Sequence, residues 1–323
     1  MLVGYTVRMM EITTTSITDW LRAHFDLGPP TGVSLLRSWT NDVYLVKTTR
    51  DRFVLKLYGA GWRTDSEIRY EIAVLDHLAA RGVRVARAIR GVDGDALRHL
   101  DIDGRQRQAV LFRYADGAKP QPPFSAEMYY HEGMATAALH RAADDFTSNH
   151  HRRPLDLAYL IDQPLALVRS LDIDSSTKQA ILDFGARLRE RIEAFAGRGL
   201  DWGVCHGDLT FDNFHLTHDG ETVWYDFDSG GPGWRAIDLQ GWAASQPDRV
   251  QDQQAFLQGY REVRALDDND VAASPYLAAA LELWGVQVDL ERRIIALGND
   301  TVGSYCAHWV GPIESWQMMP GLG

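Results

Sequence analysis

The stretch His206–Asn213, which reads H-G-D-L-T-F-D-N, is the feature that most limits what this chain can fold into. Asp208 and Asn213 stand five residues apart in it, and Asp226 follows thirteen residues later in the run Y-D-F-D. In a regular strand, residues five apart point to opposite faces of the sheet. A turn between Asp208 and Asn213 instead lets both side chains face one point. We therefore expect short strand-like runs broken by turns over residues 202–228.

The residues on either side of this loop divide the chain into two lobes. The first lobe is predicted as a small antiparallel sheet with one main helix at residues 65–81, where Ile68, Ile72, Leu75 and Leu78 are spaced three and four apart. Alternating and β-branched residues predict its strands at residues 33–36, 42–48, 52–58, 88–92 and 108–114. A short helix from Thr18 to about Phe25, capped by Ser16, is expected before them.

The second lobe is predicted to be larger and mainly helical. Its helices are expected at residues 126–142, 155–171, 176–196, 252–263 and 276–297. The segment 115–123, rich in Pro and Gly, is typical of a linker. The predicted fold class is therefore α+β and bilobal, with residues 1–114 as the first lobe and residues 115–323 as the second.

Composition excludes several classes of protein. The 323 residues are 45% hydrophobic and 24% charged, as in globular proteins, and the two cysteines form no disulfide framework. No window approaches the roughly 18 apolar residues of a membrane helix, and the N-terminus lacks the pattern of a signal peptide. We therefore expect a soluble, cytoplasmic protein that does not bind membranes.

The charge is concentrated in the last part of the chain. The net charge is −11, and residues 201–323 hold 19 acidic residues against six arginines and no lysine. Such an acidic region repels nucleic-acid backbones, so DNA and RNA are not expected as partners. It suits metal ions or a cationic substrate, or is a solvated surface that keeps the protein soluble.

The order of the polar motifs indicates phosphoryl transfer. The spacing from Asp208 to Asn213 matches the kinase catalytic loop H-R-D-x-x-x-x-N, with Gly207 in place of arginine, and Asp226 begins D-F-D where kinases have D-F-G. This reaction needs magnesium on the phosphate oxygens and a carboxylate at the attacking hydroxyl. Oxygen ligands suit magnesium, so Asn213 and Asp226 are predicted as its ligands, and Asp208 as the group that accepts or orients the hydroxyl.

A lysine on the third predicted strand fits the same chemistry. Lys56, in the run R-F-V-L-K-L-Y, stands where the V-A-I-K lysine of kinases holds the α and β phosphates. The helix that follows carries Glu67 and Glu71, and one of them is expected to pair with Lys56. Glu71 is preferred because it lies beside the buried face of the helix, whereas Glu67 lies one turn earlier.

With these motifs, the chain resembles the aminoglycoside phosphotransferase and choline kinase family, a branch of the protein-kinase-like fold that includes homoserine kinases and a bacterial stress-response protein kinase. The similarity in motif order covers roughly residues 30–300. The resemblance implies that Asp208 is the catalytic base, that Asn213 and Asp226 bind magnesium and that Lys56 contacts ATP. It also implies that the adenine lies near Phe112–Tyr114.

The sequence departs from protein kinases at the phosphate loop. The G-x-G-x-x-G motif is absent, and the equivalent turn reads S-W-T-N-D. Ser38, Thr40 and Asn41 are expected to offer hydroxyl, amide or backbone N–H groups to the phosphates.

Other polar residues around the loop are predicted to support it. His206 is expected to brace the loop by hydrogen bonds, and Asp238, at the end of G-P-G-W-R-A-I-D, to accept backbone N–H groups. Asp228 is either such a support or a magnesium contact. A zinc cluster of Asp208 with the histidines is the alternative for this region; the histidines are His206, His215 and His218.

Seven of the ten tryptophans fall in residues 201–323. Most are expected in the core, but aromatic rings beside carboxylates also attract cations. Trp284 with Glu282, Asp289 and Glu291 is therefore predicted as a wall of the acceptor site.

The predicted function is an ATP- and magnesium-dependent phosphotransferase that acts on a hydroxyl of a small molecule such as an amino sugar, amino alcohol or hydroxy amino acid, with a cationic acceptor as one candidate. A protein Ser/Thr kinase of the stress-response type is the first alternative, because both enzymes use the same catalytic loop. A nucleotide-binding regulator without catalysis is the second, and the intact set of catalytic residues argues against it.

Overall fold

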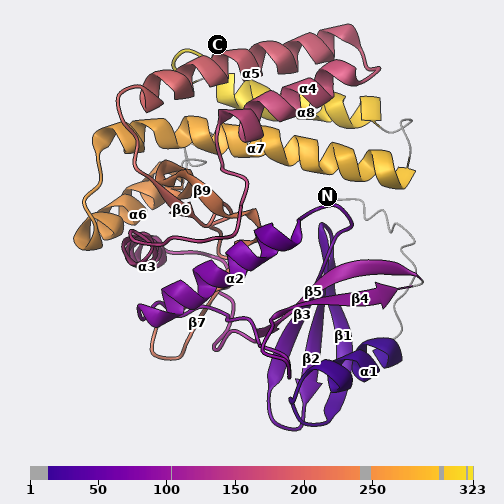
Figure 1. Cartoon of the computed structure of the whole chain (residues 1–323). Helices are drawn as coiled ribbons and strands as arrows, with labels where there is room; N and C mark the ends of the chain where they lie inside the picture. Colours follow the sequence, from indigo (N-terminus) through magenta and orange to yellow (C-terminus); the bar gives the residue numbers. More distant parts are fainter. Residues whose placement is uncertain (1–13, 103, 241–248, 298–301, 318, 323) are drawn as a thin grey trace. The chain divides into compact units, whose positions relative to one another are not determined.

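The computed structural model describes residues 14–102, 104–240, 249–297, 302–317 and 319–322. The chain forms two compact units (Figure 1). The first unit comprises residues 1–117 and two short later segments, 148–151 and 223–225. The second unit comprises the remainder of the chain. The predicted division of the chain into two lobes after residue 114 stays a prediction.

The first unit is built on a five-stranded antiparallel sheet in the order β1-β2-β3-β5-β4. The strands are β1 (Pro30–Ser38), β2 (Asn41–Thr48), β3 (Arg52–Tyr58), β4 (Leu97–Ile102) and β5 (Arg105–Arg113), and the helices are α1 (Thr14–His24) and α2 (Asp65–Ala80).

The two helices of this unit contact opposite faces of the sheet. Successive side chains of a strand point to opposite faces. Leu55 and Leu57 of β3 join a buried cluster with Ile17 and Leu21 of α1. Lys56, between them, forms an ion pair with α2. The strand therefore presents its lysine to α2 because the two leucines face α1.

The second unit is mainly helical (Figure 1). Its helices are α3 (Ala126–Ala142), the π-helical turn η1 (Ala158–Asp162) that leads into α4 (Gln163–Ser170), α5 (Ser175–Ala196), α6 (Val250–Val263), α7 (Asp268–Leu297) and α8 (Val302–Gln317). Between α5 and α6 lie β6 (Trp202–Cys205), β7 (Phe214–Leu216), β8 (Thr222–Trp224), η2 (Phe227–Ser229), β9 (Gly231–Trp234) and η3 (Arg235–Asp238). β6 and β9 pair antiparallel, and in the sequence they stand on either side of the motifs at residues 206–213 and 225–228.

The α+β class is confirmed, but several predicted elements were wrong. The strand expected at residues 88–92 is only an isolated bridge from Ala88 to Phe112. The strand that is present instead is β4, which pairs with β5 along its whole length and buries Leu97 and Leu100. The predicted stretch has apolar residues too, but it meets β5 only at that one bridge, whereas β4 pairs with β5 from Leu97 to Ile102.

Helix ends and one whole helix were also mispredicted. α1 begins at Thr14, so Ser16 lies inside the helix and is not its cap. α7 begins eight residues before the predicted start and contains Pro275. α8 was not predicted, and the segment expected as one helix at 155–171 is divided into η1 and α4. Pro275 lies inside α7, although proline usually interrupts a helix.

α3 and α6 approach each other closely at two glycines. A Cβ atom on Gly133 would lie 2.0 Å from the carbonyl oxygen of Phe256, and one on Gly259 would lie 1.9 Å from that of Tyr130. These are backbone contacts, so a larger residue must push the helices apart.

We expect Gly259→Ala to lower the free energy of unfolding by about 1–3 kcal/mol, because it overpacks this contact. Gly285→Ala is the matched control: it is also a glycine inside a helix, but its added Cβ meets nothing within 4 Å among the described residues. Chemical denaturation measures both variants. The close approach would be refuted if the Gly259 variant were as stable as wild type.

Candidate active site

Lys56 is held in the first unit by a buried carboxylate. Its Nζ lies 3.5 Å from Oε1 of Glu71 on α2, and both side chains are almost fully buried. The Tyr58 hydroxyl donates to the other oxygen of Glu71 at 2.9 Å. Because a buried lysine needs a charge partner, this geometry fixes the direction in which Lys56 points.

Glu67, the alternative partner of Lys56, instead caps the start of α2. It sits in the first turn of α2 and accepts a hydrogen bond at 3.0 Å from the backbone N–H of Thr64, whose hydroxyl accepts in turn from the Glu67 N–H. This reciprocal arrangement is a capping box. Glu67 also pairs with Arg63 at 3.9 Å. Of the two glutamates, the structure therefore brings Glu71 to Lys56.

The turn between β1 and β2 is braced by the side chains predicted to meet phosphate. Ser38 donates its hydroxyl proton to Asp42 at 2.6 Å, and Asp42 pairs with Arg107. Oδ1 of Asn41 accepts from the backbone N–H of Gly59 at 3.2 Å. The Ser38 hydroxyl proton and the Asn41 Oδ1 are thus engaged within the turn. Phosphate contact by Ser38, Thr40 and Asn41, through hydroxyl, amide or backbone N–H groups, stays a prediction.

The predicted adenine residues lie at the end of β5. Phe112 is buried and pairs with Val54 across the sheet. The ring of Tyr114 lies under the guanidinium of Arg52 at 4.3 Å. Adenine contact by Phe112 and Tyr114 stays a prediction.

In the second unit, Asp208 is exposed in the loop that follows β6. Nδ2 of the buried Asn213 donates to both the backbone carbonyl and Oδ2 of Asp208, each at 2.8 Å. The turn therefore brings the two residues together, as the spacing predicted. Because Nδ2 is used in these two bonds, Oδ1 is the atom of the Asn213 amide that is suited to a metal.

Gly207 shapes the start of this loop. It has a φ of 76°, which favours glycine, and an added Cβ would lie 2.6 Å from the carbonyl oxygen of Ser229. The loop before Asp208 thus packs directly on the segment that follows Asp226. A side chain at position 207 would therefore meet both a left-handed backbone and the Ser229 carbonyl.

Asp226 adopts a left-handed backbone with a φ of 63°, a conformation that aspartate tolerates better than most residues. The segment after it is held by Arg152, which donates to the carbonyl oxygen of Gly230 at 2.7 Å and to that of Asp228. Arg152 is 4% exposed. This role of Arg152 was not predicted, because Arg152 lies in the run H-H-R-R, which is typical of a solvated loop.

Asp238 is the buried anchor of the loop. It accepts from the backbone N–H groups of His206 at 2.7 Å and Gly207 at 2.9 Å, and from Nε2 of His140 on α3 at 3.1 Å. Nδ1 of His140 accepts from the hydroxyl of Tyr260 on α6 at 2.8 Å. The chain of hydrogen bonds therefore ties the loop to α3 and α6.

The titration of these groups agrees with their roles. Burial raises the pKa of Asp238, but the hydrogen bonds from His140 and from the Gly207 N–H outweigh it, so the net pKa lies below the ordinary value. Burial lowers the pKa of His140 and raises that of Tyr260 to about 12. Asp238 is thus ionised while His140 is neutral and Tyr260 keeps its proton.

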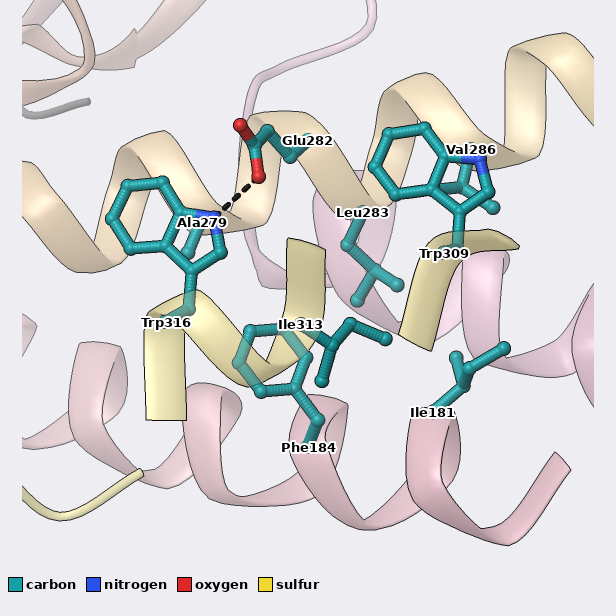
Figure 2. Close-up of a pocket in the computed structure, with 9 residues that line it drawn as sticks. All are labelled: Ile181, Phe184, Ala279, Glu282, Leu283, Val286, Trp309, Ile313 and Trp316. Carbon is teal, nitrogen blue, oxygen red and sulfur yellow. Dashed lines mark hydrogen bonds between the residues drawn. The ribbon is translucent and has the colours of Figure 1, made fainter. Parts of the chain in front are cut away.

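The four residues predicted as a substrate wall do not come together. Glu282 accepts from the indole N–H of Trp316 in a small apolar pocket between α5, α7 and α8 (Figure 2). Asp289 likewise accepts from the hydroxyl of Tyr305 on α8.

Trp284 and Glu291 lie elsewhere on α7. The ring of Trp284 packs on Tyr159, with centroids 5.6 Å apart, and Glu291 is exposed beside Gln287. At 3.6 residues per turn, Glu282 lies about 160° around the helix from Trp284. One continuous wall was therefore a wrong prediction, because sequence proximity does not put residues on one helix face.

The zinc alternative finds no support in the geometry. Among the described residues, no three His, Cys, Asp or Glu side chains are grouped so that they could hold a metal ion. His206 is fully buried with its ring 4.4 Å from that of Phe227, and His218 is on the surface beside Asp219.

Comparisons with known proteins define the class. A family model described as the phosphotransferase enzyme family matches residues 32–273. An uncharacterized protein of Deinococcus radiodurans is 38% identical over 300 residues, which is 90% of this chain and 85% of that protein. A homoserine kinase of Rhodopseudomonas palustris is 32% identical over 249 residues, 74% of this chain and 72% of the kinase.

Two solved structures share the fold. An amicoumacin kinase in complex with AMP-PNP, Ca²⁺ and Ami has a TM-score of 0.73 at 18% identity, covering 93% of this chain and 92% of its own. A microcompartment-associated aminopropanol kinase also has a TM-score of 0.73, at 22% identity, covering 96% and 99%.

The fold and the order of its site residues are those of kinases. The chain belongs to the phosphotransferase enzyme family and is an enzyme that transfers phosphate to a hydroxyl group. Among the described residues, no helix is long and apolar enough to cross a bilayer.

Proposed function

We propose that this protein is an ATP- and magnesium-dependent kinase that phosphorylates a hydroxyl of a small molecule carrying an amine, such as an amino alcohol or hydroxy amino acid. The observation that carries the proposal is the pairing of the exposed Asp208 with the buried Asn213. It combines a solvent-accessible carboxylate with an oriented amide oxygen, the two groups that phosphoryl transfer needs at one point.

Asp208 is the base in this proposal. As the acceptor oxygen bonds to phosphorus, the bond from phosphorus to the leaving oxygen of ATP breaks, and the hydroxyl proton passes to the Asp208 carboxylate. Asn213 holds that carboxylate in one orientation through its Nδ2. A positioned carboxylate contributes by being in place before the reaction begins.

The residues present fit a magnesium ion. Oδ1 of Asn213 and the carboxylate of Asp226 are oxygen donors of the type that magnesium prefers. When bound, the ion neutralises charge on the phosphate oxygens. The role of this chain is to hold the two donors, Asn213 through its bonds to Asp208 and Asp226 through the segment braced by Arg152.

The first unit supplies the nucleotide contacts in this proposal. Lys56, held by Glu71, binds the α and β phosphates, with Thr40 and Asn41 as further donors. Phe112 and Tyr114 line the adenine position. The amicoumacin kinase structure, which has the same fold, contains an ATP analogue and supports this role.

The acceptor class rests on the relatives. Homoserine, the substrate named for the relative at 32% identity, and aminopropanol, named for a structural neighbour, both carry an amine and a hydroxyl. The excess of acidic residues in 201–323 favours an acceptor that carries an ammonium group over an anionic acceptor without one.

An ADP-release assay over a panel of acceptors tests the proposal. The panel contains homoserine, aminopropanol, choline, aminoglycosides, neutral sugars and a generic protein. We expect turnover with at least one amine-bearing alcohol, and loss of turnover when EDTA removes the metal and its recovery when magnesium is added. Turnover on protein alone would favour the Ser/Thr kinase alternative and overturn the small-molecule proposal.

A further inference from the structure

Gln240 forms a second link between the catalytic loop and α3, besides the one through His140 and Asp238. It lies just after η3 and is 5% exposed. Its Nε2 donates to the carbonyl oxygen of Leu209 at 3.2 Å and to Oε1 of Glu132 on α3 at 2.9 Å. Leu209 is the residue that follows Asp208, so the amide of Gln240 holds the backbone next to the proposed base.

The backbone of Gln240 indicates that its side chain is needed. Its φ is 56°, in the left-handed region that glycine adopts without penalty. A residue with a Cβ costs about 1–2 kcal/mol there. The two hydrogen bonds of the side chain are an interaction that glycine cannot make, and they offset this cost.

Glu132 is the second half of the link. It is 2% exposed, and its Oε2 has no hydrogen-bond partner in the part of the chain that the structure describes. Burial raises its pKa to about 8, with the bond from Gln240 acting against the rise. At neutral pH the carboxyl is therefore mostly protonated, and it accepts from Gln240 without placing a full charge in the core.

Together with the contacts described above, the loop is held at three successive places. Asp238 binds the N–H groups of His206 and Gly207, Asn213 binds Asp208, and Gln240 binds the carbonyl of Leu209. The contact from Gln240 is the one that links the backbone directly after Asp208 to Glu132 of α3.

We propose that Gln240, oriented by Glu132, is a positioning residue that sets the Asp208 carboxylate for phosphate transfer. This inference rests on the proposed function of Asp208. It concerns the rate of the chemical step, because Gln240 contacts the backbone of the loop and no reacting atom. Misplacing a catalytic group by about 1 Å is enough to slow a reaction by as much as 10²-fold.

The decisive variant is Gln240→Met, which keeps the length of the side chain and removes its donors. We expect kcat to fall about 10- to 100-fold while the KM for ATP changes less than twofold. Gln253→Met is the matched control. The Nε2 atom of Gln253 lies 3.4 Å from the carbonyl oxygen of Leu239 and 3.4 Å from the hydroxyl of Ser274, and neither residue belongs to the catalytic loop. The kcat of Gln253→Met should therefore stay within twofold of wild type.

Variants of Glu132 separate orientation from mere packing. Glu132→Gln keeps an acceptor oxygen for Gln240, so we expect near-normal kcat. Glu132→Leu removes that acceptor, so kcat should fall, though by less than in Gln240→Met. Equal activity in Glu132→Leu and Glu132→Gln would overturn the role given to Glu132.

Hydrogen exchange of the loop amides, residues 206–213, gives a readout that needs no substrate. In Gln240→Met we expect faster exchange there than in wild type or Gln253→Met. If the wild-type enzyme turns over an acceptor and Asp208→Asn does not, the proposed function stands. An unchanged kcat together with unchanged loop exchange in Gln240→Met then refutes this inference alone. If no acceptor is turned over, the proposed function fails, and unchanged exchange still decides against Gln240.

Discussion

Replacing Asp208 by asparagine is expected to remove most of the phosphate transfer, with kcat falling about 10²- to 10⁴-fold, because a neutral amide cannot take the proton of the acceptor hydroxyl. The asparagine keeps an oxygen that accepts from Nδ2 of Asn213, so the loop retains its shape. ATP affinity, measured by calorimetry, should therefore stay close to that of wild type.

Asp212→Asn is the control for this variant. Asp212 lies in the same loop, but its side chain is mostly exposed and pairs with Lys119 at 2.7 Å. Exposed ion pairs contribute little, so its kcat should remain within twofold of wild type. The role of Asp208 would be disproved if Asp208→Asn kept wild-type turnover, or if it lost ATP binding as fully as it lost turnover.

The largest expected loss of stability comes from Asp238→Ala. The change leaves the backbone N–H groups of His206 and Gly207 buried without their acceptor, together with Nε2 of His140. An unpaired buried donor costs about 1–3 kcal/mol, and we expect the free energy of unfolding to fall by about 3–5 kcal/mol. Urea denaturation at pH 7 measures it. Asp268→Ala, at a largely exposed carboxylate, should change it little.

The same residue gives a pH dependence with a definite sign. The pKa of Asp238 in the folded protein lies below the value of 3.8 of a free aspartate. Its stabilising effect is therefore present above that value and disappears as the pH falls through the folded pKa. The difference in stability between wild type and Asp238→Asn, which keeps one acceptor oxygen, should shrink below pH 4. A difference that grew toward acid pH would contradict the ionised state assigned to Asp238.

The sequence by itself was sufficient for the class of protein and for the pairing of Asp208 with Asn213. The order of Lys56, Asp208, Asn213 and Asp226 predicted a phosphotransferase, and the family match agrees. This was possible because a turn with fixed spacing is a local property. The six residues from Asp208 to Asn213 form one turn, and the Asn213 side chain bonds to Asp208 within it.

The partner of Lys56 needed the tertiary structure. Glu67 and Glu71 are one helical turn apart, so both lie on the same side of α2 and periodicity separates them poorly. What separates them is the start of the helix, where Glu67 is used in the capping box with Thr64. Glu71 then meets Lys56 because β3 and α2 pack against each other.

The supports of the loop were decided by contacts between residues far apart in the chain. Arg152 reads as a surface residue in its local sequence, and Gln240 has no motif, yet both are buried against backbone carbonyls of the catalytic segments. The predicted wall around Trp284 failed for the converse reason, since neighbours in sequence diverge on a helix. Burial and hydrogen-bond partners of this kind depend on which elements pack together, and local spacing carries no information about that.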